Sequence, residues 1–288
     1  MTRPLTAEQV ARAFHDACLA ELDALKPGNV HRFGADDVGM SVADFETSAR
    51  VAAPALAAPG LSVGARIRRS VEATIDAVGH NTNLGIVLLS APLASAALEP
   101  AGGDLRERLA KILAGLSVAD AREAYAAIRY AKPGGLGEAR AHDVGGEPDV
   151  TLLEAMEAAE GRDRIAWNYT HDFTDIFDLG LARFEQAMAE SDSLPPAATS
   201  VYLGFLASIP DTLIARKFGI TQALEVQQEA KVLVARLGNL ADDEQARGHD
   251  LMAFDRSLKA RGLNPGTSAD LTVATLFAAS LQALEIGC

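Results

Sequence analysis

The run "LGIVLLSAPLASAAL", residues 84–98, is the longest apolar stretch of the chain and the best guide to its fold. A helix that crosses a bilayer needs about 20 apolar residues, so this run is too short, and Pro92 interrupts it. Leu and Ala, which dominate the run, favour helix. We therefore predict a buried core helix here rather than a membrane span.

The composition of the whole chain agrees with this interpretation. Of 288 residues, 49% are apolar and only 5% are aromatic, which favours closely packed helices over sheets. Gly and Pro punctuate the sequence, but no low-complexity linker and no repeat of fixed period divides it. We expect an all-α fold with a single compact multi-helix domain over residues 1–288.

Helix starts can be recognised by a Ser or Thr that precedes an acid or amide by three residues. Thr6, Ser41, Ser117 and Thr151 each begin such a pattern before an apolar-periodic segment. The predicted helices span about 6–25, 41–57, 63–78, 82–98, 104–114, 118–130, 151–160, 172–190, 196–208, 211–218, 221–237, 241–259 and 268–285.

The formal net charge of −13 argues against binding to nucleic acid or to an anionic membrane, because both need clustered Lys and Arg. A polyphosphate ligand would require a local basic pocket or a divalent metal held by carboxylates. Cys18 and Cys288 form no disulfide framework, and the N-terminal residues lack an apolar signal region. We expect a cytoplasmic protein.

The loop "KPGNVHRFGADDVGM", residues 26–40, is the first candidate for function. Lys26, His31 and Arg32 can meet phosphate oxygens, while Asp36 and Asp37 can hold a hard divalent cation. The alternative is a simple helix end with solvated acids.

The second candidate is "GHNTN", residues 79–83, directly before the apolar run. A helix N-terminus offers unpaired N–H groups, and the Asn81, Thr82 and Asn83 side chains can read a base or a sugar hydroxyl. The alternative is an N-cap, which needs only one of the three.

Three further segments carry charged groups. The glycine-rich "AKPGGLGEARAHDVGGEP", residues 131–148, contains Glu138 but lacks the ending of a P-loop. "WNYTHDFTDIFDLG", residues 167–180, spaces Asp172 and Asp175 for a metal site, although acids also favour a first helical turn. In "PDTLIARKFG", residues 210–219, the charges have ordinary helical explanations, with Arg216 near a C-terminal end.

Taken in order, "KPGNV", "GHNTNLGIVLL", "GGLGEA" and "DTLIARKFG" resemble the triphosphoribosyl-dephospho-CoA synthase family, the helical ATP:dephospho-CoA ribosyltransferases. The resemblance implies that the 2′-hydroxyl of dephospho-CoA attacks the ribose C1 of ATP and that adenine leaves. It also implies Mg²⁺, which would offset the triphosphate charge.

Residue by residue, the family pattern matches four groups of positions. These are Lys26, Pro27 and Gly28; Asn81, Thr82 and Gly85; Gly137 and Glu138; and Asp211, Thr212 and Arg216.

From this pattern and the chemistry of the residues we hypothesise three sets of site residues. The proposed catalytic residues are Glu138, Asp36 and Asp37. The proposed nucleotide and phosphate contacts are Lys26, His31, Asn81, Thr82, Asn83, Gly85 and Arg216. Mg²⁺ would be held by Asp36, Asp37 and Glu138, or by Asp172 and Asp175.

The chain departs from the family at two places. Asn83 and Leu84 stand where the family has His and Lys, and Asp36 stands where it tends to have His. The Asn-Thr-Asn-Leu-Gly form looks like the branch found in methanogens and methylotrophs.

The alternatives therefore include α-ribosyl phosphate transfer to a methanopterin-type acceptor, with phosphoribosyl pyrophosphate as donor, and nucleotide binding without turnover. A homodimer is also open, since Ala-rich helices can bury a dimer face although no heptad seam marks one.

Overall fold

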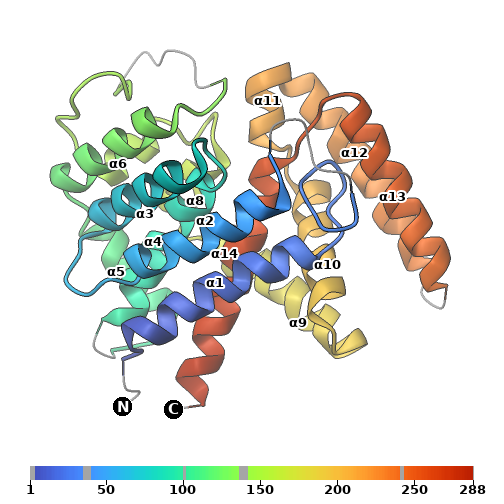
Figure 1. Cartoon of the computed structure of the whole chain (residues 1–288), viewed down its shortest axis with the longest axis horizontal. Coiled ribbons are helices and arrows are strands. Elements are labelled where there is room, and N and C mark those ends of the chain that lie inside the picture. Colours follow the sequence, from blue (N-terminus) through green and yellow to red (C-terminus); the bar gives the residue numbers. More distant parts are fainter. Residues whose placement is uncertain (1–3, 35–39, 100–101, 136–141, 241–242, 288) are drawn as a thin grey trace.

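The computed structural model describes residues 4–34, 40–99, 102–135, 142–240 and 243–287, and within these ranges the chain is helical and contains no extended strand (Figure 1). The elements are α1 (Ala7–Asp23), α2 (Val42–Leu56), α3 (Val63–Val78), α4 (Leu84–Leu98), α5 (Leu105–Ala114), α6 (Val118–Ala131), α7 (Leu152–Glu157), α8 (Arg164–Thr170), the π-helical η1 (Asp175–Gly180), α9 (Leu181–Ser191), α10 (Leu194–Ser208), α11 (Thr212–Phe218), α12 (Ile220–Gly238), α13 (Glu244–Ala260) and α14 (Gly266–Ile286).

The apolar run forms α4, a helix that is buried on nearly every side, as predicted. It packs against α3, α5 and α14, so no face of it is left for solvent. The all-α prediction is confirmed.

Helix α14 lies at the centre of the molecule, between α1 to α6 and the α9 to α13 group (Figure 1). It contacts α1, α4, α9 and α10. It is also long and apolar enough to cross a bilayer, but 56% of its apolar window is buried inside the protein. Packing in the core thus accounts for its hydropathy.

The four predicted helix starts are confirmed as capping boxes. The side chains of Thr6, Ser41, Ser117 and Thr151 each accept a hydrogen bond from the backbone three residues on, and the residue there returns one. Each box satisfies two N–H groups that a helix leaves unpaired, which explains why the starts could be located from sequence.

One predicted helix, 172–190, was wrong in its first part. Asp172 and Phe173 adopt left-handed backbone angles, with φ of 47° and 53°, and these end the preceding helix. The chain re-enters helix only at Asp175, and the prediction also missed α8.

Cys18 lies in α1 and is buried and free of any disulfide. Burial raises the pKa of its thiol, and nearby Glu21 adds to the shift. The thiol is therefore an inert part of the core. Cys288 lies outside the described residues.

Candidate active site

A cavity of about 710 Å³ lies where the N-terminal ends of α4, α8, α11 and α14 approach the C-terminal ends of α3 and α6. All four sequence segments that resemble the family contribute to its wall. They supply, in order, Asn29, residues 79–86 with Leu88, Gly134, and Leu213 with Arg216 and Lys217. Segments far apart in the sequence thus converge on one volume.

The turn between α3 and α4 forms one wall of the cavity. Gly79 ends α3 with a φ of 87°, a conformation that other residues rarely adopt. The Asn81 side-chain oxygen then accepts the N–H of Leu84 at 3.0 Å, so Asn81 caps α4. Its amide nitrogen has no hydrogen-bond acceptor among the described residues and is available to a ligand.

Thr82 and Asn83 are bound to neighbouring helices rather than left free. The Ser48 hydroxyl donates to the carbonyl of Asp44, so the Thr82 hydroxyl donates to Ser48 at 2.6 Å. The Asn83 amide nitrogen donates to the Thr74 hydroxyl at 2.9 Å, which in turn donates to a backbone carbonyl. The turn is therefore held rigidly against α2 and α3.

These bonds leave one atom of Asn83 without a partner. Asn83 is 5% exposed, and its side-chain oxygen makes no hydrogen bond within the described structure. Flipping the amide would not help, because the Thr74 proton is already used. A buried acceptor without a donor lowers the stability of the protein, so the Asn83 oxygen suggests a ligand that supplies the donor.

Arg216 lines the same cavity from α11. One guanidinium nitrogen donates to Asp163 at 3.1 Å, while its buried Nε has no partner in the described ranges. Lys132 and Lys217 are exposed at the rim and have no ion-pair partner among the described residues. Lys132, Arg216 and Lys217 form the basic wall of the cavity, which also carries the carboxyl groups of Glu21, Asp163 and Asp270.

Gly85, in the first turn of α4, allows a carboxyl group to approach the backbone closely. A Cβ atom at this position would lie 2.6 Å from the carboxyl carbon of Asp270 and 2.8 Å from Ile165. Any larger residue would have to displace both side chains, so the family glycine of the second segment makes room for Asp270.

Asp270 was not singled out from the sequence. It lines the cavity from α14 and makes no hydrogen bond or ion pair to any described residue. Burial raises its pKa well above the ordinary value, and the charges of Asp211, Glu21 and Asp163 add to this, while Arg216 opposes it. A sequence signal existed, since Asp270 is the single charged residue between Gly266 and Leu284.

Asp211, from the fourth segment, has a structural role. It is 1% exposed and caps α11 through the N–H groups of Leu213 and Ile214. Its other oxygen accepts the backbone N–H and hydroxyl of Ser268 at 2.9 Å, which ties α11 to the start of α14. The matching Asp therefore fixes the helix that carries Arg216.

The first segment is also mostly structural. Lys26 is fully buried and pairs with Glu21, and burial raises the pKa of Glu21 and lowers that of Lys26. His31 is buried and lies 3.2 Å from an oxygen of Asp255 in α13. Because neither side chain lines the cavity, the structure does not support the predicted phosphate contacts of Lys26 and His31.

The structure does not bring Asp172 and Asp175 together as the predicted metal site. Both oxygens of Asp175 are bound by Arg164 at 2.7 Å, and Asn168 donates to one of them. Asp172 is exposed, and neither residue lines the cavity. In the part of the chain that the structure describes, no three His, Cys, Asp or Glu side chains group as metal ligands. Asp36, Asp37 and Glu138 lie outside the described residues.

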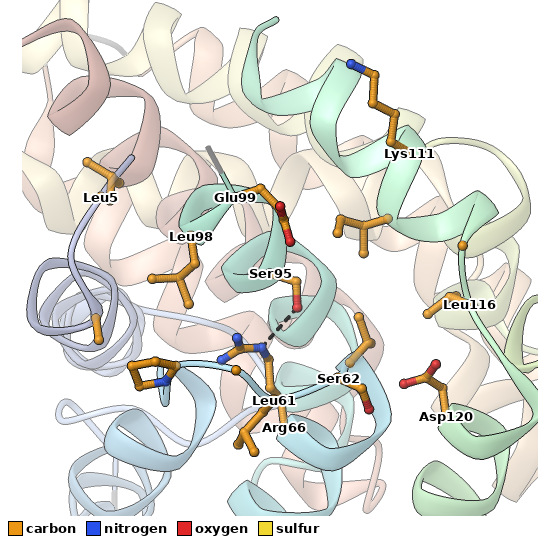
Figure 2. Close-up of a pocket in the computed structure, with 16 residues that line it drawn as sticks. Leu5, Leu61, Ser62, Arg66, Ser95, Leu98, Glu99, Lys111, Leu116 and Asp120 are labelled. Atoms are coloured by element: carbon orange, nitrogen blue, oxygen red, sulfur yellow. Dashed lines mark hydrogen bonds between the residues drawn. The ribbon is translucent and has the colours of Figure 1, made fainter. Parts of the chain in front are cut away.

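A second cavity, of about 520 Å³, lies beside the start of α3, near the C-terminal ends of α4 and α5 (Figure 2). Its buried Arg66 donates to the Ser95 hydroxyl and to two backbone carbonyls, and its Asp120 caps α6 and accepts the N–H of Gly64. None of the four family segments lines it. Its polar groups hold helix ends together, so we place the functional site in the larger cavity.

The fold and the larger cavity define an all-helical protein with a pocket for a small molecule. Over residues 7–287 the sequence matches the family CitG, ATP:dephospho-CoA triphosphoribosyl transferase, and the chain belongs to this family. It is therefore a transferase of the triphosphoribosyl-dephospho-CoA synthase type, and ATP and dephospho-CoA are the substrates that the family implies.

A solved structure supports the fold. It is assigned to a triphosphoribosyl-dephospho-CoA synthase from Archaeoglobus fulgidus and shares 23% identity with the chain. The match covers 82% of this chain and 97% of the archaeal one, with a TM-score of 0.64. No curated protein with which the chain was compared matches it significantly.

Proposed function

We propose that ATP and dephospho-CoA meet in the larger cavity, where the triphosphoribosyl group is transferred. The observation that carries this proposal is the convergence of all four family segments on one volume of about 710 Å³. That volume lies within the usual range of small-molecule sites.

The basic wall is where the triphosphate would bind. The unpaired Nε of Arg216 can donate to a phosphate oxygen, and Lys132 and Lys217 can add charge at the rim.

The Asn81 to Asn83 turn would orient the nucleoside. The free amide nitrogen of Asn81 is a donor, and the unpaired oxygen of Asn83 is an acceptor. A nucleotide offers both kinds of partner in its ribose hydroxyls and its base. The rigid attachment of this turn to α2 and α3 would hold C1 of the ribose in place for attack.

In the transfer, the bond from ribose C1 to adenine N9 breaks, and a bond from C1 to the acceptor oxygen forms. Positive charge develops on the ribose ring, as in glycoside cleavage. Mg²⁺ would offset the phosphate charge, but the described cavity residues do not supply a set of metal ligands. The proposed holders are Asp36, Asp37 and Glu138, and we derive no step through the ion.

The test is to incubate the purified protein with ATP, Mg²⁺ and dephospho-CoA and to measure free adenine by chromatography. Adenine that forms only when dephospho-CoA is present supports the proposal. Tight ATP binding without adenine release from any acceptor would instead leave a nucleotide-binding protein.

A second acceptor is favoured by one observation. Leu84 is buried at the position where the family has Lys, so the cavity lacks a cation there. We propose a pterin-type acceptor as the alternative. Adenine or pyrophosphate released only with such an acceptor, from ATP or from phosphoribosyl pyrophosphate, would establish it.

Two further expectations belong to this proposal. A homodimer would cover exposed apolar residues of α11 and α12, such as Phe218, Ile220 and Leu224, and sedimentation would detect it. A cytoplasmic location agrees with the buried free thiol of Cys18, and fractionation of cells would test it.

A further inference from the structure

The Asp270 carboxyl group is unusual because it lies partly buried at the cavity wall without a hydrogen-bond or ion-pair partner among the described residues. It lies at the cavity wall in the first turns of α14, against the backbone of Gly85. Most buried carboxylates accept hydrogen bonds that compensate for lost hydration. Asp270 accepts none from the described residues, although Asp211 in the same region accepts four.

The charged groups around Asp270 make this position unfavourable for a carboxylate. Asp211 approaches from the start of α11, Glu21 from α1 and Asp163 from the start of α8. Arg216 and Lys26 are the opposing cations, but Lys26 is paired with Glu21, and Arg216 with Asp163. Burial and these neighbours raise the pKa of Asp270, so the group holds a proton at higher pH than an ordinary Asp.

The other described acids of the cavity are already engaged. Glu21 binds Lys26. Asp163 caps α8 through the N–H of Ile165 and also binds Arg216. Among the carboxyl groups of the described cavity wall, Asp270 is thus the one whose oxygens remain open to a ligand.

We propose that Asp270 is the catalytic acid that donates a proton to a ring nitrogen of adenine as the bond from ribose C1 to N9 breaks. This inference rests on the proposed function of the cavity. The electron pair of the broken bond leaves with adenine, which departs as a neutral base. The acceptor oxygen bonds to C1, and its proton returns through solvent to the Asp270 carboxylate, so the group is restored.

Gly85 allows the Asp270 carboxyl to lie close to the proposed nucleoside site. The glycine lets the carboxyl lie beside the Asn81 to Asn83 turn, which is proposed to orient the nucleoside. The adenine of ATP and the carboxyl group of Asp270 would therefore lie next to each other, because the turn and Gly85 are adjacent in the backbone. General acids of this kind contribute about 10²- to 10⁴-fold to rate.

The test compares two donors with Asp270→Asn. ATP needs a proton on its leaving base, whereas N7-methyl-ATP carries a positive charge on the purine and leaves without one. We expect Asp270→Asn to lose about 10²- to 10⁴-fold in adenine release from ATP, but to stay within about tenfold of the unmodified protein with N7-methyl-ATP. Asp270→Glu should retain part of the ATP activity.

The pH profile gives a second readout. The unmodified protein should lose activity as pH rises through the pKa of Asp270, and Asp270→Asn should lack this limb. Equal losses with both donors, or an unchanged rate with ATP, would overturn the role as an acid.

A stability measurement tests the inference independently of turnover. If the unmodified protein releases no adenine with any acceptor, the proposed function fails. The inference is then judged on thermal unfolding at pH 8, where Asp270→Asn should be at least as stable as the unmodified protein, because a neutral amide replaces an unbound carboxylate. A lower melting temperature would show that the carboxyl serves the fold and would overturn the inference.

Discussion

Replacing Gly85 by Ala tests the cavity geometry with a single methyl group. Gly85 lies in the first turn of α4, where Ala would favour helix over Gly by up to about 1 kcal/mol. The methyl group, however, would lie 2.6 Å from the carboxyl carbon of Asp270. Helix propensity and cavity geometry thus act in opposite directions at this one position.

The size of the expected effect follows from the contact distances. Ordinary contact begins at about 3.4 Å, and a carboxyl oxygen of Asp270 lies closer still than the carboxyl carbon, so the carboxyl must withdraw by more than about 1 Å, and Ile165, at 2.8 Å, must also shift. A displacement of about 1 Å at a reacting group can reduce a rate by about 10²-fold. We expect Gly85→Ala to lower kcat by roughly this factor and to leave the helical fold intact.

The assay is adenine release from ATP with dephospho-CoA, alongside thermal unfolding. Gly248→Ala in α13 is the matched control, because an added Cβ there meets no atom within 4 Å. It should gain stability by up to about 1 kcal/mol, or about 2 °C in Tm, with unchanged activity. If Gly85→Ala retained activity within threefold of the unmodified protein, the argument that Gly85 makes room for a working Asp270 would fail.

Three further outcomes are expected. Arg216→Lys keeps the charge but removes Nε, so the KM for ATP should rise by about tenfold or more in steady-state assays; an unchanged KM would remove the predicted phosphate contact. Asp175→Asn should lose about 3–5 kcal/mol in urea unfolding, because it leaves Arg164 unpaired, with the Mg²⁺ dependence of turnover unchanged. Burial tends to raise the pKa of Asp255, but hydrogen bonds, first from His31, give a net lowering. Its contribution to stability is therefore present above the unfolded pKa of about 3.9 and is lost as pH falls through the lower folded value. Asp255→Asn should accordingly be less stable than the unmodified protein at pH 7, with the gap closing in acid.

Much of the fold could be predicted because its signals are local. Capping boxes at Thr6, Ser41, Ser117 and Thr151 depend on residues three apart, and all four are confirmed. The break at Asp172 could not be foreseen. It depends on the bidentate pair of Asp175 with Arg164 and on two left-handed residues, for which the helical spacing of the acids gave no sign.

The site was predictable only in part, because matched motifs mix structural and ligand-facing residues. Asn81, Thr82, Asn83, Gly85 and Arg216 all line the cavity, and their contacts with nucleotide or phosphate stay a prediction. Asp270 was missed, since its importance comes from contact with Gly85 across the fold, although it is the single charged residue of its apolar segment.

The loop that begins with Lys26 supports the site through its backbone, although its charged side chains do not line the cavity. The backbone N–H of Gly28 donates to Asp255 at 2.9 Å, and Tyr202 donates to the carbonyl of Pro27 at 2.7 Å. These bonds anchor the end of α1 to α13 and α10.

The same anchoring places Asn29 at the cavity wall, where its amide donates to Asn264 at 2.7 Å. Asn264 lies just before α14, the helix that carries Asp270. Lys26 also compensates the charge of Glu21, an acid of the cavity wall that comes from the N-terminal part of the chain. The loop therefore fixes both the surroundings of Asp270 and the charge in them. Its basic residue thus acts on the site by pairing within the core rather than by binding phosphate.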